Sequence, residues 1–367
     1  MQKSHSHLII TRHDQRTRAR ANMHFIAQEL VKRGPTHMFS FGFSWLSRFK
    51  RDQRMELWNR AGKVETQNGV ECYLWRTLLH PVNLRTKLLY PVERLWFSLY
   101  LACVPTIFIQ WIKSSGVIII ESSFPVIFIR MCKRLNPAAT LIYLASDSLT
   151  TIDCAQTILQ NFKNDGKLFD YVIAPSSLLI PEMPHGVPVH VVPHGLDTSI
   201  ASRETTSPYD DGVHIVSVGS MLFDETFFTI AADAFPDITF HVIGGGARAA
   251  TLTAPNITVY SEMKFEDTIA YLQHAQAGVA PYQGDKVAPF LTNTSMKLMQ
   301  YGFLGLPSLC PASIVGEHKS RFGYIPGDKS SIIQAIRTAL RHGRFEGEPA
   351  LSWEEVTARI LAPADNA

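Results

Sequence analysis

The sequence LTNTSMKLMQYGFLGLP, residues 291–307, decides the fold of the second half of the chain. It follows a short apolar stretch over 277–281 and predicts a helix over 296–304. The helix-capping types Asn, Thr and Ser stand at 293–295, and Gly305 ends the helix. A helix that follows a parallel strand presents free N–H groups and its positive dipole end at the carboxyl edge of the sheet. The segment therefore predicts an α/β fold with a ligand site at this helix.

Lys297 stands in the first turn of this helix, where the helix dipole makes a cation unfavourable. An anion bound at the helix N-terminus would remove that penalty, and a diphosphate is the usual ligand there. The alternative is an ordinary surface lysine beside a capped helix. The segment alone leaves both interpretations open.

Length and composition restrict the class of protein. A chain of 367 residues with 46% hydrophobic and 18% charged residues is long enough for two domains with separate cores. A formal net charge of +3 is too small to indicate a nucleic-acid partner. The five cysteines are widely spaced and contain no CxxC pair, which favours a reducing compartment over disulfides or structural zinc. We expect no signal peptide and exposure to the cytosol.

Short apolar strands alternate with helical stretches along the chain, which is typical of parallel sheets covered by helices. The first series of strands is predicted at His7–Thr11, Met38–Phe41, Val117–Glu121, Thr140–Ala145, Tyr171–Ala174 and Val189–Val192. After Pro193 the series restarts at His214–Val218, Ile238–Ile243, Ile257–Tyr260, Gly278–Pro281 and Ser308–Leu309. Helices are predicted between them, for example at Asn22–Lys32, Thr151–Phe162, Thr226–Ala234, Phe265–His274 and Ser330–Arg341.

The polar stretch ETTSPYDD over 204–211 is typical of a linker. We expect domains over 1–200 and 201–345, followed by a C-terminal helix over 346–367 that could cross back to the first domain. The expected architecture is α/β, with two doubly wound, Rossmann-like domains facing a central cleft.

The segment YPVERLWFSLYLACVPTIFIQWI, residues 90–112, departs from this alternation. Charged residues and Pro105 interrupt it, so it lacks the ~20 clean apolar residues of a membrane span. One interpretation is a buried helix of the first domain. The other, which the many aromatic residues favour, is an amphipathic helix lying on an anionic membrane surface with Trp96, Tyr100 and Trp111 at headgroup level.

Polar and adaptable side chains follow several strands of the second half. Met221 follows the first of these strands, Gly244–Gly246 the second, Glu262 and Met263 the third, and Tyr282 the fourth. Each of them, taken singly, is explained by a turn or by packing. Together with the lysine of the 296–304 helix they predict a nucleoside diphosphate site, in which Glu262 accepts from ribose hydroxyls and the Met and Tyr side chains pack against the base.

The first half should then hold the acceptor and a general base. Asp147 follows an apolar strand at the expected edge of the cleft, where a carboxylate can accept the proton of an attacking hydroxyl. Two alternatives exist. Asp147 could be the N-cap of the following helix, and His13 could be the general base in its place. The sequence favours Asp147. It has no DxD at a strand end, so we expect no metal, with Lys297 and its helix N-terminus stabilising a leaving diphosphate.

Several motifs now resemble a known family. PHGLD at 193–197 and TSMKLMQYGFLGLP at 294–307 resemble GT-B glycosyltransferases. YLASDSL at 143–149, SVGSMLFDE at 217–225 and NTSMKLMQ at 293–300 resemble, more narrowly, the membrane-associated β-glucuronosyltransferases of xanthan-type exopolysaccharide assembly. The resemblance covers nearly the whole chain. The paired-glutamate EX₇E pattern of retaining GT-B enzymes is absent, which argues for an inverting mechanism.

The resemblance implies metal-independent, inverting transfer of glucuronic acid from UDP-glucuronate to the mannose of a polyprenyl-diphosphate-linked oligosaccharide. It implies a peripheral location on the cytoplasmic face of the bacterial inner membrane, with acceptor and membrane binding in the first domain and donor binding in the second. The catalytic aspartate of the family falls on Asp147. Its donor-site residues fall on Met221, Met263, Tyr282, Ser295, Met296, Lys297 and Gln300, and further cleft positions fall on Glu182, Asp197 and Asp224.

Other functions remain as alternatives. A nucleotide-sugar-binding or lipid-binding adaptor would bind UDP without turnover, and a GT-B transferase could use another UDP-sugar. A dinucleotide oxidoreductase is disfavoured because neither domain begins with GxGxxG after its first strand. The glucuronate carboxylate requires a cation or a cluster of hydrogen-bond donors, for which Lys297, Lys286 and an arginine of the first domain are all open candidates.

Overall fold

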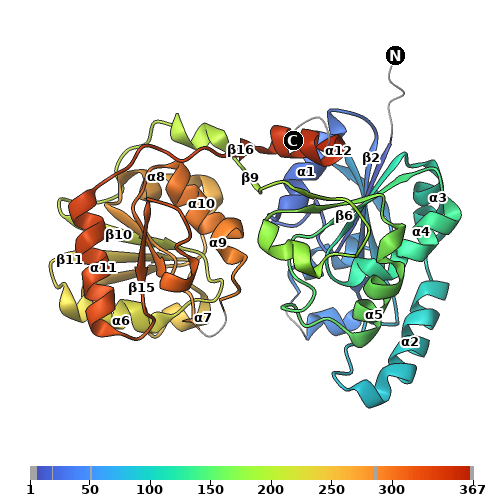
Figure 1. Cartoon of the computed structure of the whole chain (residues 1–367), viewed down its shortest axis with the longest axis horizontal. Coiled ribbons are helices and arrows are strands. Elements are labelled where there is room, and N and C mark those ends of the chain that lie inside the picture. Colours follow the sequence, from blue (N-terminus) through green and yellow to red (C-terminus); the bar gives the residue numbers. More distant parts are fainter. Residues whose placement is uncertain (1–5, 19, 50–51, 285–286, 364–367) are drawn as a thin grey trace. The chain divides into compact units, whose positions relative to one another are not determined.

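The chain forms two compact units (Figure 1), and the computed structural model describes residues 6–18, 20–49, 52–284 and 287–363. Unit 1 consists of Met1–Gly195 with Trp353–Ala367, and unit 2 consists of Leu196–Ser352. Residues 204–211 belong to unit 2 and are not a linker, because the Tyr209 ring stacks on His214 at 4.4 Å and its hydroxyl donates to Tyr271 O at 2.8 Å.

Unit 1 is built on an eight-stranded sheet in the order β3-β4-β2-β1-β5-β6-β7-β8. Only the β3–β4 pair is antiparallel. Central strands such as β5 and β6 are almost wholly buried and read as continuous apolar runs, as expected for parallel strands covered on both faces. The strands are β1 (His7–Thr11), β2 (Thr36–Phe43), β3 (Val64–Gln67), β4 (Val70–Arg76), β5 (Val117–Glu121), β6 (Thr140–Leu144), β7 (Tyr171–Ala174) and β8 (Val189–Val191).

The helices of unit 1 connect and cover these strands. They are α1 (Asn22–Val31), α2 (Tyr90–Ala102), α3 (Thr106–Ser114), α4 (Ile129–Leu135), α5 (Gln156–Asp165) and, from the C-terminal segment, α12 (Trp353–Leu361). The 3₁₀ helices of this unit are η1 (Trp45–Arg48), η2 (Gln53–Arg60), η3 (Lys87–Leu89), η4 (Phe124–Phe128), η5 (Gly166–Leu168) and η6 (Ser177–Glu182).

The C-terminal helix α12 is an integral part of unit 1. Trp353 stacks on Phe25 of α1 with ring centroids 5.0 Å apart, and Tyr171 Oη donates to Ile360 O at 2.9 Å. A Cβ on Gly195 would lie only 2.7 Å from Trp353 Cδ2, so the packing of this tryptophan requires glycine at that position.

Unit 2 is a fully parallel sheet in the order β12-β11-β10-β13-β14-β15. Its strands are β10 (Val213–Val218), β11 (Ile238–Ile243), β12 (Ile257–Tyr260), β13 (Ala277–Val279), β14 (Ser308–Pro311) and β15 (Arg321–Tyr324). Its helices are α6 (Glu225–Ala234), α7 (Gly246–Ala249), α8 (Phe265–His274), α9 (Leu291–Thr294), α10 (Met296–Phe303) and α11 (Lys329–His342), with 3₁₀ turns η7 (Thr198–Ala201) and η9 (Ala312–Ile314). The short strands β9 (Gly195–Leu196) and β16 (Leu351–Ser352) pair with each other.

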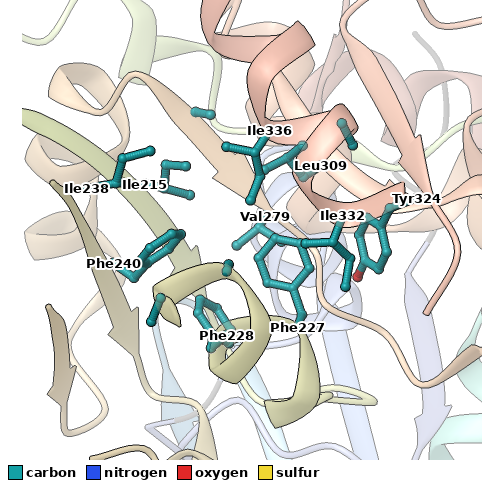
Figure 2. Close-up of a cluster of buried hydrophobic side chains, with 14 of the residues drawn as sticks. Ile215, Phe227, Phe228, Ile238, Phe240, Val279, Leu309, Tyr324, Ile332 and Ile336 are labelled. Atoms are coloured by element: carbon teal, nitrogen blue, oxygen red, sulfur yellow. The ribbon is translucent and has the colours of Figure 1, made fainter. Parts of the chain in front are cut away.

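The core of unit 2 lies between its sheet and helices α6 and α11 (Figure 2). Phe227 and Phe228 of α6 and Ile332 and Ile336 of α11 are fully buried against strand residues such as Phe240. Burying one such side chain contributes roughly 1.5–3 kcal/mol to folding. This cluster therefore stabilises the sheet, and the loops at the carboxyl ends of its strands carry the candidate site.

Residues 90–112 form two helices, and only one of them has a large exposed apolar face. In α2 the stripe Val92, Leu95 and Leu99 is 56%, 62% and 50% exposed, whereas Tyr100 is fully buried. Trp111 of α3 is also buried and stacks on a histidine of β2. The expectation that Tyr100 and Trp111 lie at headgroup level is therefore wrong, because both rings fill the core. Trp96 is half-buried and donates to His80 O at 2.8 Å.

Among the described residues, no single helix is long and apolar enough to cross a membrane. By length and composition alone, α2 and α3 could do so as a pair, bent by 80° at the break between them.

Candidate functional site

Both sheets reverse their strand order beside their first strand. In unit 1 the reversal lies between β1 and β5, and in unit 2 it lies between β10 and β13. The loops that leave the carboxyl ends of two such strands diverge, and the crevice between them is where doubly wound folds bind ligands. Each unit therefore has one preferred place for a site.

A pocket of about 740 Å³ lies at the reversal in unit 1. The end of β5 and the loops after β1, β5 and β6 line it, and they contribute Arg12, His13, Glu121, Ser122 and Asp147. Charged groups of both signs thus meet in a space large enough for a sugar.

Asp147 is exposed to this pocket in the loop after β6. Its backbone N–H donates to Ser122 Oγ at 3.1 Å, which ties the loop to the end of β5. Desolvation by the surrounding loops, and then the charge of Glu121, raise the pKa of the Asp147 carboxyl to about 6. Such a group is largely ionised at neutral pH and still basic enough to accept a proton from a hydroxyl.

Asp147 does not cap the following helix, as the alternative interpretation had it. Helix α5 begins at Gln156 with Ala155 as its N-cap, later than the predicted start at Thr151. The buried Glu93 of α2 instead accepts from the N–H and the hydroxyl of Thr157, at 2.7 and 2.8 Å, in the first turn of α5. Asp147 is therefore free of this structural task.

His13, the competing base, lines the same pocket. Desolvation and the positive charges of Arg54 and Arg12 lower the pKa of its imidazole to about 4. An imidazole with that pKa is neutral at pH 7 and a much weaker base than Asp147. The electrostatics of the pocket therefore favour Asp147.

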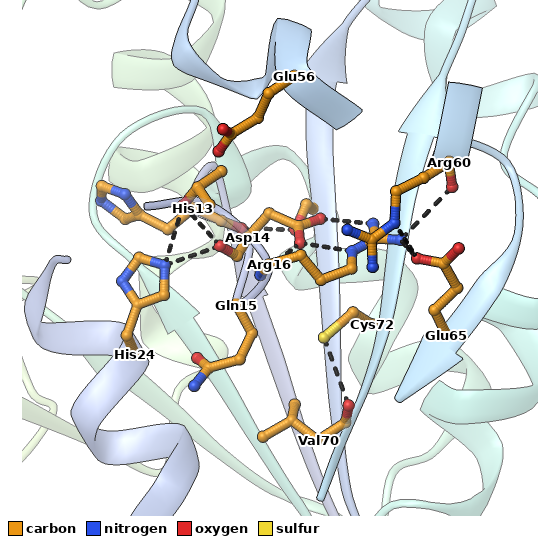
Figure 3. Close-up of polar contacts among 12 residues, drawn as sticks. His13, Asp14, Gln15, Arg16, His24, Glu56, Arg60, Glu65, Val70 and Cys72 are labelled. Atoms are coloured by element: carbon orange, nitrogen blue, oxygen red, sulfur yellow. Dashed lines mark hydrogen bonds and ion pairs between the residues drawn. The ribbon is translucent and has the colours of Figure 1, made fainter. Parts of the chain in front are cut away.

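The loop after β1 is held in place by an ionic network centred on the buried side chains of Asp14 and Arg16 (Figure 3). Arg16 donates to both carboxylate oxygens of Asp14 at 2.8 Å and to Glu65 Oε2 at 2.8 Å, and Arg60 donates to the same Glu65 oxygen. His24 Nδ1 accepts from a backbone N–H at 2.8 Å, so its Nε2–H donates to Asp14 O, also at 2.8 Å. These contacts fix the loop that carries His13, and within the network Asp14 itself lines the pocket.

Glu182 of η6 supports the loop on the other side of Asp147. Its carboxylate accepts from Ser148 Oγ and, at 3.2 Å, from Thr150 Oγ1. The structure therefore brings Glu182 to the Asp147 loop through hydroxyl groups.

The candidate site of unit 2 centres on the start of α10. Ser295 is its N-cap and accepts from Leu298 N at 3.3 Å, while Ser295 Oγ and Tyr282 Oη form a 2.7 Å hydrogen bond. Lys297 Nζ reaches back to the end of β10, 3.4 Å from Ser217 Oγ and 3.3 Å from a backbone carbonyl. The reversal between β10 and β13 thus brings the three predicted residues Tyr282, Ser295 and Lys297 together.

Lys297 is a cation without a counter-ion among the described residues. Its neighbours are a hydroxyl, a carbonyl and the ring of Tyr282, whose centroid lies 5.5 Å from Nζ. Desolvation lowers the pKa of the Lys297 ammonium to about 7. An anion placed here would raise that pKa again and remove the cost of the unpaired charge, which supports the diphosphate interpretation.

The other predicted donor-site residues lie around this centre in unit 2. Met221 is 48% exposed in the loop after β10, and Glu262 is exposed in the loop after β12. Gly244, with φ +63°, brings the loop after β11 against Glu262, because a Cβ there would lie 3.6 Å from Glu262 Cα. The remaining predicted residues are half-buried. Met263 lies in the loop after β12, and Met296 and Gln300 lie on α10.

Two predicted acidic residues act as caps in this structure. Asp224 is the N-cap of α6 and accepts from Thr226 N at 3.0 Å. Asp197 caps η7 and accepts from both the N–H and the hydroxyl of Ser199. Neither observation tests a role in ligand binding.

The sequence interpretation missed Glu121, the last residue of β5, and Ser217, which contacts Lys297. The signal for Glu121 was present, because the segment VIIIE places one carboxylate at the end of a buried strand.

Lys286, a candidate for binding the glucuronate carboxylate, lies outside the described residues. In the described ranges, no three His, Cys, Asp or Glu side chains are grouped as metal ligands.

Comparisons with known proteins identify relatives. Residues 9–175 match the N-terminal domain of the glucuronosyltransferase GumK. The chain is 45% identical over 357 residues to a UDP-glucuronate:glycolipid 2-beta-glucuronosyltransferase of Xanthomonas campestris pv. campestris, covering 97% of this chain and 89% of that protein.

Solved structures of low sequence identity share the fold. A structure of Anabaena Alr3699/HepE in complex with UDP and glucose is 13% identical with a TM-score of 0.65, and the likeness covers 99% of this chain and 100% of that one. A UDP-forming α,α-trehalose-phosphate synthase of Burkholderia xenovorans is 10% identical with a TM-score of 0.60, covering 97% and 95%. These likenesses confirm the GT-B fold class that the sequence predicts, with two Rossmann-like units.

Lys297→Ala should weaken the binding of UDP more than that of uridine, because the ammonium is expected to contact phosphate oxygens. A charge-assisted contact of this kind contributes about 1.5–3 kcal/mol. Titration calorimetry with both ligands measures the difference. Lys329→Ala, which removes an exposed lysine of unit 2, should leave both affinities unchanged. Equal losses for UDP and uridine in Lys297→Ala would mean that the lysine is structural.

Proposed function

Because the chain belongs to the GumK family of glucuronosyltransferases, we propose that it transfers glucuronic acid from UDP-glucuronate to a glycolipid and forms a β-linkage. The observation that carries the mechanism is the position of Asp147, a carboxylate of raised pKa in the pocket at the reversal of the unit 1 sheet. The acceptor we propose is the terminal mannose of a polyprenyl-diphosphate-linked oligosaccharide.

In the proposed reaction an acceptor hydroxyl attacks the anomeric carbon of the donor in a single displacement. Asp147 takes the hydroxyl proton, the new C–O bond forms, and the bond between the anomeric carbon and the diphosphate breaks. One displacement inverts the anomeric configuration. UDP leaves with the electron pair of the broken bond, and its negative charge is stabilised by Lys297 and the N–H groups at the start of α10.

Asp147→Asn should lower turnover by ~10²–10⁴-fold while UDP affinity stays unchanged, since the carboxylate acts on the acceptor and the substitution preserves its shape. Release of UDP in the presence of a mannose-terminated lipid acceptor measures turnover, and calorimetry measures affinity. A near-normal rate would exclude Asp147 and return attention to His13. A wild-type protein that binds UDP but never releases it from UDP-glucuronate would indicate an adaptor.

We further propose that the transfer needs no metal ion. This proposal is supported by the positive charge that the protein itself supplies. The ammonium of Lys297 and the positive end of the α10 helix dipole lie at the place that we propose for the diphosphate. Activity should therefore be the same after EDTA treatment and after addition of Mg²⁺ or Mn²⁺. Loss of UDP release with EDTA, restored by either cation, would contradict this mechanism.

A glycolipid acceptor requires contact with a membrane, and we propose that α2 provides it. Val92, Leu95 and Leu99 recur at helical spacing and form an exposed apolar stripe on α2, and the exposed Arg94 lies beside it. The proposed arrangement is peripheral, on the cytoplasmic face of the bacterial inner membrane, with the stripe in the headgroup region and nearby cations attracted to anionic lipid.

Replacing Leu95 and Leu99 together with serine should weaken binding to vesicles that contain anionic lipid by roughly tenfold, because each leucine loses part of its apolar burial. Vesicle flotation measures binding, and UDP affinity should not change. Val259→Ser with Ile325→Ser, which alters two exposed apolar residues of unit 2, is the matched control. Retained binding would place the membrane contact elsewhere. Trp111→Ser is unsuitable because it would open the core.

A further inference from the structure

A chain of polar side chains crosses the sheet of unit 2. His214 of β10 and His241 of β11 are 7% and 6% exposed, and the ring nitrogens that face one another, His214 Nδ1 and His241 Nε2, lie 3.0 Å apart. His214 Nε2 lies 3.0 Å from Asp210 O, and His241 Nδ1 lies 3.1 Å from Tyr260 Oη. The chain therefore runs from the segment before β10 to the last residue of β12.

The backbone carbonyl at one end sets the direction of each hydrogen bond in the neutral chain. A carbonyl oxygen only accepts, so His214 Nε2–H donates to Asp210 O and His214 Nδ1 accepts from His241 Nε2–H. His241 Nδ1 then accepts from the Tyr260 hydroxyl. Desolvation, and then the nearby His214, lower the pKa of His241 to about 4, which keeps this ring neutral at pH 7. Desolvation, and then the neighbouring Tyr271, raise the pKa of the Tyr260 hydroxyl to about 12, so it keeps the proton that it donates.

Stability alone does not account for this chain. Phe240, which precedes His241 in β11 and therefore faces the other side of the sheet, packs with apolar side chains of α6 and α11 (Figure 2). Apolar side chains thus fill one side of the sheet, and they would fill the other without the cost of burying polar groups. The polar chain is better explained by a task that needs directed hydrogen bonds.

The chain ends on the edge strand β12, which little burial holds in place. All four residues of β12 are half-buried or exposed, and Val259 is 40% exposed. The Tyr260 hydroxyl ties the last residue of this strand to the buried His241 of the neighbouring strand. Tyr271 of α8 lies edge-on against the Tyr260 ring, with centroids 5.4 Å apart. The chain therefore anchors the end of an edge strand to the interior of unit 2.

The end of β12 leads directly into the predicted nucleoside site. Glu262 and Met263 follow Tyr260 by two and three residues, and they are the side chains expected to contact the ribose and the base. Tyr260 O accepts from Gly244 N at 3.2 Å, and a Cβ on Gly244 would lie 3.6 Å from Glu262 Cα. The loops after β11 and β12 thus pack on one another directly beyond Tyr260. A shift of the end of β12 would move both predicted contact residues.

We propose that Tyr260 and His241 are positioning residues for the nucleoside end of the donor: their hydrogen bond fixes the end of β12 and the loop that follows it. This inference rests on the proposed function, in which unit 2 binds a UDP-sugar. Both residues act through the loop that carries Glu262 and Met263. A loop that is already fixed loses less conformational entropy when a ligand binds, so the hydrogen bond strengthens nucleoside binding.

Tyr260→Phe removes one hydroxyl from a half-buried ring and is the decisive variant. Its affinity for uridine should fall by roughly 3–10-fold, the effect of one lost hydrogen bond, and its affinity for UDP should fall by the same factor. Its affinity for inorganic diphosphate should not change, because Lys297 and the start of α10 are untouched. KM for UDP-glucuronate should rise with kcat unchanged, because the proposed base Asp147 lies in unit 1. Titration calorimetry measures the three affinities.

Further variants make the result specific. Tyr209→Phe removes a hydroxyl that donates to Tyr271 O at 2.8 Å, beside the same two histidines but without a bond to β12, and should leave uridine affinity unchanged. In a His241→Leu background, Tyr260→Phe should have no further effect on uridine affinity, because the hydrogen-bond partner is already gone. His241→Gln, whose amide provides a donor and an acceptor, should recover part of the affinity that His241→Leu loses.

Equal uridine affinities of Tyr260→Phe and the wild type would overturn the inference. An equal loss in Tyr209→Phe would also overturn it, because the cluster would then only stabilise the unit. Tyr260→Phe loses one hydrogen bond at an edge strand, so the outcome does not depend on whether the His241 variants fold. A wild-type protein that binds neither uridine nor UDP would instead refute the donor site of the proposed function, so the two failures are distinguishable.

Discussion

The reversal of strand order in each sheet is the constraint on which both candidate sites depend. Parallel strands carry all their carboxyl ends at one edge, and only between β1 and β5 and between β10 and β13 do the connecting loops leave in opposite directions. The acidic pocket and the α10 lysine site occupy these two places. Neither site requires an unusual fold, because each lies in the crevice between diverging loops at the strand-order reversal of its sheet.

The two sites supply opposite kinds of chemistry. Unit 1 presents two carboxylates, Asp147 and Glu121, whose pKa values are raised chiefly by desolvation, as an acceptor of protons requires. Unit 2 presents an ammonium and a capped helix N-terminus, as a leaving diphosphate requires. Glycosyl transfer from a nucleotide donor needs both, which explains why one chain combines two units of the same architecture with different residues at the strand ends.

The sequence predicted the parallel sheets well because their buried strands are continuous apolar runs with clear ends, and β1, β5, β7, β11 and β12 have the predicted bounds. The β3–β4 hairpin and β15 were missed. β3 alternates exposed and half-buried residues, and its polar composition resembles a loop.

For α2 and α3, composition could not show which side faces the core. The aromatic rings that suggested a membrane surface are mostly buried, and the exposed stripe is leucine and valine. The contacts of Lys297 with Ser217 and of Asp147 with Ser122 join residues that are far apart in the sequence and lie in separate elements or loops, and no local pattern encodes them.

The ion-paired charges of unit 1 contrast with the two charged groups, Glu121 and Lys297, that lie in the candidate sites. The buried Arg16 pairs with Asp14 and Glu65, and the buried Arg54 pairs with Asp52, so each guanidinium makes two or more charged hydrogen bonds, as a stable interior demands. Glu121 and Lys297 are also desolvated, yet among the described residues neither makes such a pair. Leaving them unpaired costs stability that the same fold avoids elsewhere. Because both stand at the strand-order reversals, the cost is best explained by the ligands and the proton that these groups are there to meet.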